Sequence, residues 1–237
     1  MKVTLINYTT GALELLIFTK GTRLKMSPEG LDDIMVWPME RKLKEIEYMA
    51  NTIPSSWEFC DYTFMIEDVT RAFTHQLVRT RTASFAQQSH RVTNMSEFDT
   101  LEPESIKSDP ESHGAWNSRI SSIKATYEYL LSRGISIEDA RGVLPTNILT
   151  NIVMKINMRN FVELVHKRTS PRVQGEYRDV LKAMQAEVMS VHPWMSLFLR
   201  RTFDQAAVDL DNEIASIEDS DKKLRMMKLV DQLRAKQ

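Results

Sequence analysis

The chain has 237 residues, of which 42% are hydrophobic, and this is enough for the core of one large domain or two small ones. It carries 31 basic and 32 acidic residues, so the net charge of −1 provides no overall field for a nucleic-acid polymer or an anionic membrane. The single cysteine, Cys60, excludes an internal disulfide and a multi-cysteine zinc site. Any anion site must therefore be local.

The first ten residues contain one basic residue and no apolar run long enough for a signal peptide. No later stretch approaches the roughly 18 apolar residues of a membrane span. We therefore expect a protein without a membrane segment, located in the cytoplasm, where a lone thiol stays reduced. Fourteen methionines against seven glycines predict few tight turns and much helix.

The first predicted elements follow from the spacing of apolar residues. Residues 3–6 form a short β-favouring run that predicts an opening strand, whereas residues 11–24 fit a helix and a strand equally well. Apolar residues at spacings of three and four predict an amphipathic helix over 39–51, ended near Pro54. Alternation predicts a strand over 62–66.

A further helix is predicted up to about Arg79, with Asp68 or Thr70 as its N-cap. The stretch 80–94 behind it is polar, and we interpret it as irregular. Residues 97–112 are acidic and contain proline, which indicates a surface loop.

The middle of the chain alternates between helix and strand signals. Residues 116–131 show helical periodicity, and Ser136 opens a short helix that stops before Pro145. A mixture of isoleucine, valine and threonine predicts a strand over 147–156. Asn157 is then the N-cap of a helix that runs to about residue 168.

The last part of the chain begins with a turn at 170–171, followed by a predicted helix over 174–189 and a packed turn after residue 192. The segment 214–237 is charged and helix-prone, so we interpret it as a solvated or partner-facing helix. The simplest architecture is one α+β domain over residues 1–213, followed by this helix.

Three arginines and several short polar side chains follow one another over residues 76–91. A guanidinium group presents a planar fork of donors that matches phosphate oxygens, and serine hydroxyls and turn N–H groups can complete such a site. Gln76 and Gln87 each offer a donor and an acceptor, which reading a uracil or a flavin edge requires. The composition indicates an anion site; the alternative is a solvated loop whose arginines pair with nearby acids.

A second cluster of polar and charged residues extends over 157–178. Asn157 and Arg159 fall in the first turn of a predicted helix, whose positive end favours phosphate or pyrophosphate, whereas Arg168 lies at its far end. A helix cap and salt bridges would explain the same residues. Arg141 is an isolated basic residue that is uninformative by itself.

Other catalytic patterns are weak or missing. None of the five histidines forms a close metal-binding pair, so we expect no metal. The sequence has no nucleophile elbow, P-loop or Rossmann glycine motif. Cys60 has no neighbouring cation in the sequence, and we interpret it as a buried structural thiol rather than a nucleophile.

These segments together resemble the flavin-dependent thymidylate synthase family. Arg79-Thr80-Arg81, seven further residues and Ser89 are similar to the family signature of Arg-His-Arg, seven residues and Ser. The resemblance covers roughly residues 40–195, in the family's order and close to its spacings. Further matching segments lie at 70–72, 75–78, 89–91, 141–145, 157–159, 168 and 174–178.

The resemblance implies an α+β fold with a mainly antiparallel sheet packed by helices, and a homotetramer whose active sites form between subunits. It implies FAD gripped by the signature arginines, with the flavin lined by Ser55, Arg79, Thr80, Arg81, Gln87, Asn157, Arg159 and Glu163. The nucleotide would be held by Gln76, Arg79, Gln87, Ser89, Arg91, Arg141 and Arg168.

The chemistry implied by the resemblance is reductive methylation of dUMP to dTMP. Methylenetetrahydrofolate donates the one-carbon unit, NADPH reduces the flavin, and the reduced flavin supplies the hydride. No protein nucleophile is required, and the protein contributes mainly positioning and electrostatics. Arg168 corresponds to the residue that in the family faces the pyrimidine ring and favours its ionised form, which suits a permanently charged guanidinium.

Four positions depart from the family pattern. Thr80 replaces the central histidine of the signature, Phe59 replaces a histidine after Glu58, and Ile53 stands where a further histidine is expected. Glu163 stands where the family has Asn or His against the flavin. Losing imidazoles removes proton carriers near neutral pH, and a carboxylate near a reduced flavin disfavours its anionic form.

These departures leave alternatives open. The same scaffold could act on another pyrimidine nucleotide or hydroxymethylate it. A second alternative is a non-catalytic nucleotide-binding relic that has lost flavin. A third, an interaction protein built on the charged C-terminal helix, rests on that tail alone.

Overall fold

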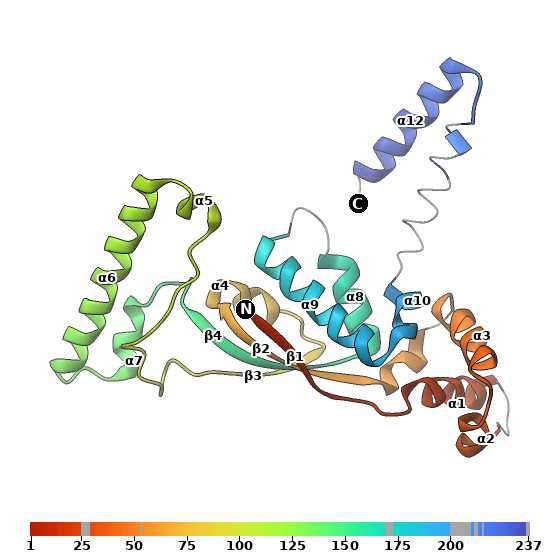
Figure 1. The fold of residues 1–237 in the computed structure, drawn as a ribbon, viewed down its shortest axis with the longest axis horizontal. Coiled ribbons are helices and arrows are strands. Elements are labelled where there is room, and N and C mark those ends of the chain that lie inside the picture. Colours follow the sequence, from red (N-terminus) through yellow and green to blue (C-terminus); the bar gives the residue numbers. More distant parts are fainter. Residues whose placement is uncertain are drawn as a thin grey trace. The chain divides into compact units, whose positions relative to one another are not determined.

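The computed structural model describes residues 1–24, 29–52, 54–168, 173–199, 210, 213–214 and 216–235 (Figure 1). The chain divides into two compact units, Met1–Met195 and Ser196–Gln237. Among the described residues, we find no helix with the length and apolar character needed to cross a bilayer.

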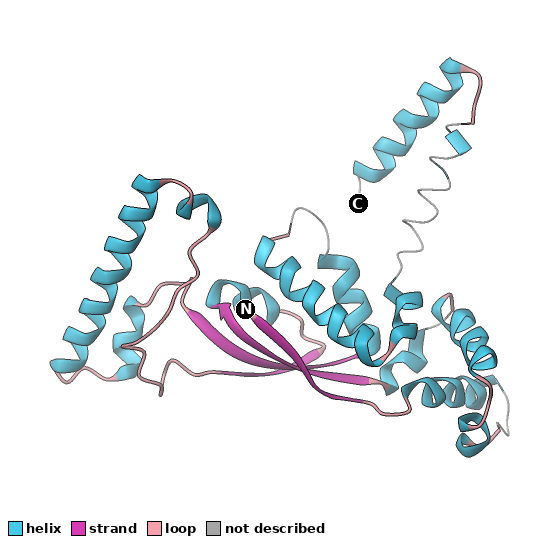
Figure 2. Ribbon diagram, viewed as in Figure 1, coloured by secondary structure: helices cyan, strands magenta, loops and turns pink. Residues whose placement is uncertain are grey.

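The first unit is built on a four-stranded antiparallel sheet (Figure 2). Its strands, in spatial order, are β1 (Lys2–Tyr8), β2 (Asp61–Thr70), β4 (Leu149–Asn157) and β3 (Ala83–Gln87). The antiparallel sheet within an α+β unit is confirmed, as are the strands predicted over 3–6, 62–66 and 147–156.

The main core lies on one face of this sheet. Alternate side chains of a strand point to the same face, and in β2 these are the fully buried Tyr62, Phe64 and Ile66. Helices α8 (Met158–Arg168) and α9 (Gly175–Val191) pack over this face (Figure 1). The ring of Phe161 in α8 stacks on Phe64 with 5.7 Å between centroids.

The helices before β2 form a separate group. The segment 11–24, which fits either element by pattern, is helix α1 (Ala12–Leu24). It is followed by α2 (Leu31–Met35), α3 (Met39–Ala50) and the 3-10 helix η1 (Pro54–Phe59). Lys42 of α3 is buried, and its Nζ lies 2.6 Å from Glu14 Oε1 of α1 and 2.9 Å from the Met35 carbonyl oxygen. This buried ion pair joins the first three helices.

Two segments predicted to be irregular are ordered elements. Within 80–94, Ala83–Gln87 form β3, because the backbone of this short edge strand pairs with β4 even though its side chains other than Phe85 are small or polar. Within 97–112, α5 (Glu104–Lys107) and the start of α6 (Pro110–Ser132) replace the predicted loop. Proline is well tolerated in the first helical turn, so its presence here marked a helix start.

A second, smaller core lies under α6. Helix α6 is followed by α7 (Ile137–Ala140) and the 3-10 helix η2 (Arg141–Val143). The Met95 backbone N–H donates to the hydroxyl of the fully buried Tyr127 at 3.2 Å. The buried members of this core are Met95, Phe98, Tyr127, Ala140 and Ile148.

After α9, the chain forms the 3-10 helix η3 (Pro193–Met195). The second unit contains α10 (Ser196–Leu199) and α12 (Ser220–Ala235), which confirms a helix in the charged tail. The turn predicted at 170–171 lies outside the described residues. The domain boundary at residue 213 stays a prediction.

Candidate functional site

Helix α4 (Arg71–Leu77) begins the segment that carries the arginine signature. Its N-cap is Thr70, whose Oγ1 accepts a hydrogen bond from the Phe73 backbone N–H at 3.0 Å. Asp68, the other predicted cap, instead has a φ of 55° at an irregularity between β2 and β4, where its N–H donates to Asn151 Oδ1 at 3.1 Å. The helix ends at Leu77, so the signature arginines lie in the turn that follows it.

Two residues at the start of α9 hold α4 in place. Glu176 accepts hydrogen bonds from the Thr70 backbone N–H at 2.7 Å and from the Thr70 hydroxyl at 2.6 Å. Gln76 Nε2 donates to Gln174 Oε1 at 2.6 Å. Both ends of α4 are therefore tied to α9, and Gln76 is one of the residues predicted to hold the nucleotide.

The turn between α4 and β3 contains Arg79, Thr80 and Arg81. Both arginines are exposed, and neither guanidinium group has a hydrogen-bond or ion-pair partner among the residues that the structure describes. Gln87, at the other end of β3, donates from Nε2 to Thr74 Oγ1 at 2.8 Å. The two signature arginines are thus available to an anionic ligand.

The first turn of α8 lies at the same end of the sheet as this turn, because Ala83 of β3 pairs with Ile156 of β4. Asn157 caps α8, as predicted: its Oδ1 accepts from the Asn160 N–H at 2.9 Å. The flavin residues predicted around Arg79 and Asn157 therefore share one end of the sheet.

Arg159 and Glu163 form an ion-pair group on α8. Arg159 Nη1 lies 2.5 Å from Glu58 Oε1, and Arg159 Nε lies 3.5 Å from Glu163 Oε1. The hydrogen bond to Glu58 raises the pKa of Arg159. Glu163 also lies 3.1 Å from Lys167, so two cations offset the carboxylate that departs from the family pattern.

Three other predicted or departing residues lie near η1. Ser55 Oγ accepts a hydrogen bond from Arg23 Nη1 at 2.8 Å. Phe59 is 59% exposed, and Ile53 lies outside the described residues. Cys60 is fully buried, as predicted, and burial together with the charge of Asp61 raises the pKa of its thiol to about 12. This thiol is therefore not an activated nucleophile.

Arg168 closes α8 beside a buried phenol. Its guanidinium carbon lies 5.3 Å from the ring centroid of Tyr177, which in turn meets the Phe73 ring edge-on at 5.1 Å. Burial raises the pKa of Tyr177, while the neighbouring Thr80 side chain and the Arg168 charge oppose this rise. The predicted flavin residue Thr80 and the predicted catalytic residue Arg168 thus meet at one side chain.

The remaining nucleotide residues lie beyond the opposite end of β3. Arg91 Nε lies 3.1 Å from Glu138 Oε2, and Arg141 Nε donates to the Glu138 carbonyl oxygen at 3.1 Å. Ser89 Oγ accepts from the Arg91 N–H at 3.3 Å. The structure therefore brings Arg91 and Arg141 to one residue of α7.

A cavity of about 310 Å³ opens beside Arg141. Arg71, His75 and His90 also line it, and the pattern reasoning assigned no role to these three. The sequence did contain a sign of their role: Arg71 and His75 lie in segments that match the family, and His90 lies between the predicted nucleotide residues Ser89 and Arg91. The other lining residues are Gly142, Leu144, Pro145, Thr146 and Ile148.

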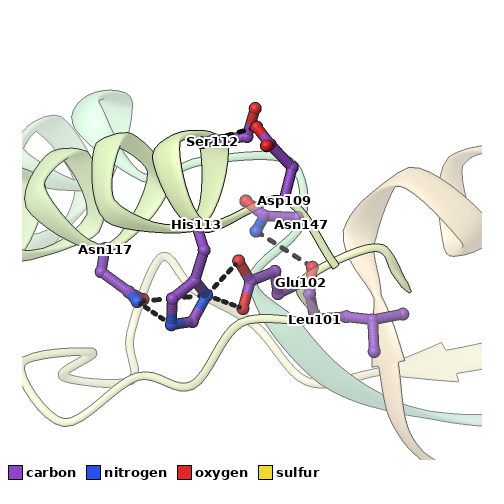
Figure 3. Close-up of polar contacts among 7 residues, drawn as sticks. All are labelled: Leu101, Glu102, Asp109, Ser112, His113, Asn117 and Asn147. Carbon is purple, nitrogen blue, oxygen red and sulfur yellow. Dashed lines mark hydrogen bonds and ion pairs between the residues drawn. The ribbon is translucent and has the colours of Figure 1, made fainter. Parts of the chain in front are cut away.

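Polar contacts join the segment before α5 to α6 and to the residues that lead into β4 (Figure 3). Asn147 Nδ2 donates to the Leu101 carbonyl oxygen at 3.3 Å, and the Leu101 N–H donates to the Asn147 carbonyl oxygen at 3.0 Å. His113 of α6 points at Glu102, with Nδ1 2.8 Å from Oε1, and Asn117 contacts the same imidazole (Figure 3). These contacts tie the start of α6 to the chain entering β4.

The predicted site residues thus form two groups within one chain. Gln87 is four residues from Ala83, so β3 separates the two ends by roughly 13 Å. The turn with Arg79 and the start of α8 lie at one end, whereas Ser89 and Arg91 follow the other end. Gln76 contacts Gln174, the N-cap of α9, and Arg168 contacts Tyr177 within α9.

Comparison with known proteins follows the same segments. The family described as "Thymidylate synthase complementing protein" (Thy1) matches residues 4–194. The flavin-dependent thymidylate synthase of Pyrococcus furiosus is 34% identical over 194 residues, covering 79% of each chain. That of Clostridium tetani is 28% identical over 211 residues, covering 81% of this chain and 84% of the relative.

Solved structures agree on the fold. Thymidylate Synthase X from Helicobacter pylori, crystallised with FAD and dUMP, superposes with a TM-score of 0.65 at 20% identity. The match covers 84% of this chain and 100% of that one. At this identity the likeness establishes the fold alone.

Proposed function

This chain belongs to the Thy1 family of flavin-dependent thymidylate synthases, and from that premise we propose that it converts dUMP to dTMP by flavin-dependent reductive methylation. One observation of the structure supports this most directly. The exposed residues Arg79 and Arg81 lie at the end of the sheet where Asn157 caps α8. Guanidinium forks and a helix N-terminus are the groups that bind the phosphates of a dinucleotide.

The donors at this end of the sheet fit FAD. Arg79 and Arg81 would hold its phosphates, and Asn157 and Arg159 would contact it from the first turn of α8. FAD bound here would supply the redox chemistry, with NADPH as the electron source and methylenetetrahydrofolate as the one-carbon donor. Glu163 carries less effective charge than an isolated carboxylate, because Arg159 and Lys167 pair with it.

Arg168 is the residue that we assign to the pyrimidine ring. A guanidinium group remains charged throughout the accessible pH range, so it stabilises negative charge that develops on the ring in the transition state. Its position over Tyr177 restricts its movement, and α9 holds Tyr177 in the core. The chain thus binds and orients, and its electrostatics favour the ionised substrate.

We also propose that the active enzyme is a homotetramer with sites shared between subunits. The face of the sheet opposite α8 and α9 carries Thr63, Met65 and Val153, which are only partly buried, and the exposed Ala86. The same face carries the paired Lys155 and Asp61, so its apolar part is a strip with Met65, Val153 and Ala86. An apolar strip that is not fully buried within the subunit favours assembly. Light scattering coupled to size-exclusion chromatography should then report a mass near four chains, and a monomer would contradict this proposal.

The first test is the visible absorbance of purified protein after addition of FAD, with dUMP titrated in. We expect flavin bands that shift on nucleotide addition. Incubation with dUMP, methylenetetrahydrofolate and NADPH should then yield a nucleotide heavier by one methyl group. A hydroxymethylated product, or activity only on another pyrimidine nucleotide, would support the first alternative.

Arg168→Ala separates catalysis from folding. We expect it to abolish turnover while FAD uptake and the melting temperature change little, because the guanidinium group acts on the nucleotide. Arg119→Ala, an exposed arginine of α6, is the matched control and should keep full activity. Protein that takes up no FAD, yet is stabilised by dUMP, would instead identify a nucleotide-binding relic.

A further inference from the structure

The cavity between α4 and η2 gathers two arginines and two histidines from separate parts of the chain. Arg71 and His75 come from α4, Arg141 from η2, and His90 from the segment after β3. Its volume of about 310 Å³ is at the lower end of small-molecule pockets, which span roughly 300–1,000 Å³. It is large enough for a phosphate group.

The two arginines lack a neutralising carboxylate here. In the part of the chain that the structure describes, the Arg71 guanidinium has no ion pair, and Arg141 bonds only to a backbone carbonyl, that of Glu138. The Glu138 carboxylate pairs with Arg91 instead. Burial, and then the nearby charge of Arg141, lowers the pKa of Arg71. Two like charges kept together without a carboxylate are typical of an anion site.

His90 is the most buried polar residue of this cavity. The residue is 6% exposed, and its buried Nε2 atom has no hydrogen-bond partner among the described residues. A buried polar atom without a partner is costly, and a bound ligand is one way to satisfy it. Burial, then the charges of Arg71 and Arg141, lower the pKa of His90, so the imidazole is neutral at neutral pH.

The family resemblance already assigns Arg141 to the nucleotide, and we propose that Arg71 and His90 complete this site around the nucleotide phosphate and that His90 takes up a proton when the anion binds. The proposal rests on the proposed function for the identity of the ligand. An anion cancels the repulsion from the two arginines and accepts a hydrogen bond from the imidazolium, so the proton affinity of His90 rises in the complex. Nucleotide affinity therefore increases as pH falls through the range in which His90 in the complex titrates.

The charged and titratable groups around His90 define the controls. Arg71 and Arg141 keep their charge throughout, which leaves His75 of α4 as the other titratable group lining the cavity. His75 is exposed, whereas His90 is buried. His75→Gln is therefore the matched control for His90→Gln.

The experiment is calorimetric titration of the FAD-loaded protein between pH 6 and 8, with dUMP and separately with sulfate. Sulfate stays a dianion over this range, so its own titration does not contribute. Repeating the titration in buffers of different ionisation enthalpy counts the protons taken up. For sulfate we expect uptake of a fraction of a proton and several-fold tighter binding at pH 6 than at pH 8. Both effects should be lost in His90→Gln and kept in His75→Gln.

Equal proton uptake in wild type and His90→Gln would overturn the role of His90, while FAD uptake and turnover would still support the proposed function. Conversely, sulfate binding with proton uptake in a protein that takes up no FAD would refute the function and keep the anion site. Arg71→Met should weaken sulfate binding roughly tenfold or more, because it removes a charged donor. Unchanged affinity in this variant would remove Arg71 from the site, and circular dichroism would verify that it folds.

Discussion

Glu176 joins α9 to the N-cap of α4 and is the most informative single position for testing how the site is held. Its carboxylate accepts two hydrogen bonds from Thr70, at 2.7 and 2.6 Å. Thr70 is 4% exposed, and its hydroxyl also caps α4 by accepting from the Phe73 N–H. Replacing Glu176 by alanine removes both acceptors and leaves the buried Thr70 N–H without a partner.

The expected cost follows from these bonds. A hydrogen bond to a charged group contributes about 1.5–3 kcal/mol, and two give about 3–6 kcal/mol. Glu176 is only partly buried, so solvent screening places the expected loss for Glu176→Ala at the lower end, about 3 kcal/mol. Glu176→Gln keeps one acceptor oxygen and should lose about half as much.

Urea unfolding followed by circular dichroism measures these values, with the slope m checked for two-state behaviour. Glu128→Ala, an exposed glutamate of α6, is the control and should change stability by less than about 0.5 kcal/mol. Combining Glu176→Ala with Thr70→Val isolates the contribution of the hydroxyl. We expect a coupling energy of about 1–2 kcal/mol.

Two results would refute the reasoning. A loss below about 1 kcal/mol in Glu176→Ala would mean that the Thr70 groups find other partners. A coupling energy near zero would mean that the hydroxyl contact contributes nothing beyond the cap. Weakened nucleotide binding in Glu176→Ala is a further expected consequence, since α4 carries Arg71 and Gln76.

The remaining expectations concern other parts of the chain. Lys42→Met should lower the free energy of unfolding in urea by about 3–5 kcal/mol, because it leaves the Glu14 carboxylate without its cation. The double variant with Glu14→Gln should recover part of this lost stability. Burial lowers the pKa of His192, so at acidic pH the unfolded chain binds a proton that the folded chain does not. The free energy of unfolding should therefore fall as pH decreases below about 6.5. Urea unfolding at pH 7.5 and 5.5 should show a smaller decrease in His192→Asn than in the wild type. Glu138→Gln releases the exposed Arg91 from its ion pair and should tighten sulfate binding in calorimetry by up to about fivefold, because such pairs contribute at most about 1 kcal/mol. Weaker sulfate binding in this variant would contradict a competition between Glu138 and the anion for Arg91.

Periodicity and capping chemistry predicted most of the regular elements. Asn157 and Thr70 cap their helices because short polar side chains satisfy the free N–H groups locally, and such contacts depend only on neighbouring residues. The alternation in β2 was equally informative because half of each strand is buried. Residues 11–24 and β3 were less predictable. Helix α1 is only partly buried, so its apolar residues show no distinct helical spacing. The edge strand β3 is defined by backbone pairing with β4 rather than by its side chains.

For the site, the sequence by itself determined the family and the segments that carry its arginines, because these are local runs at characteristic spacings. It did not reveal that Arg71, His90 and Arg141 line one cavity, or that Glu176 holds Thr70. These contacts join residues 19 to 106 positions apart, and only the pairing of strands and the packing of α4 against α9 bring them together. The tertiary structure also removes His90 from solvent beside Arg71 and Arg141. No local pattern encodes this burial, and it is what makes the proton affinity of His90 sensitive to a bound anion.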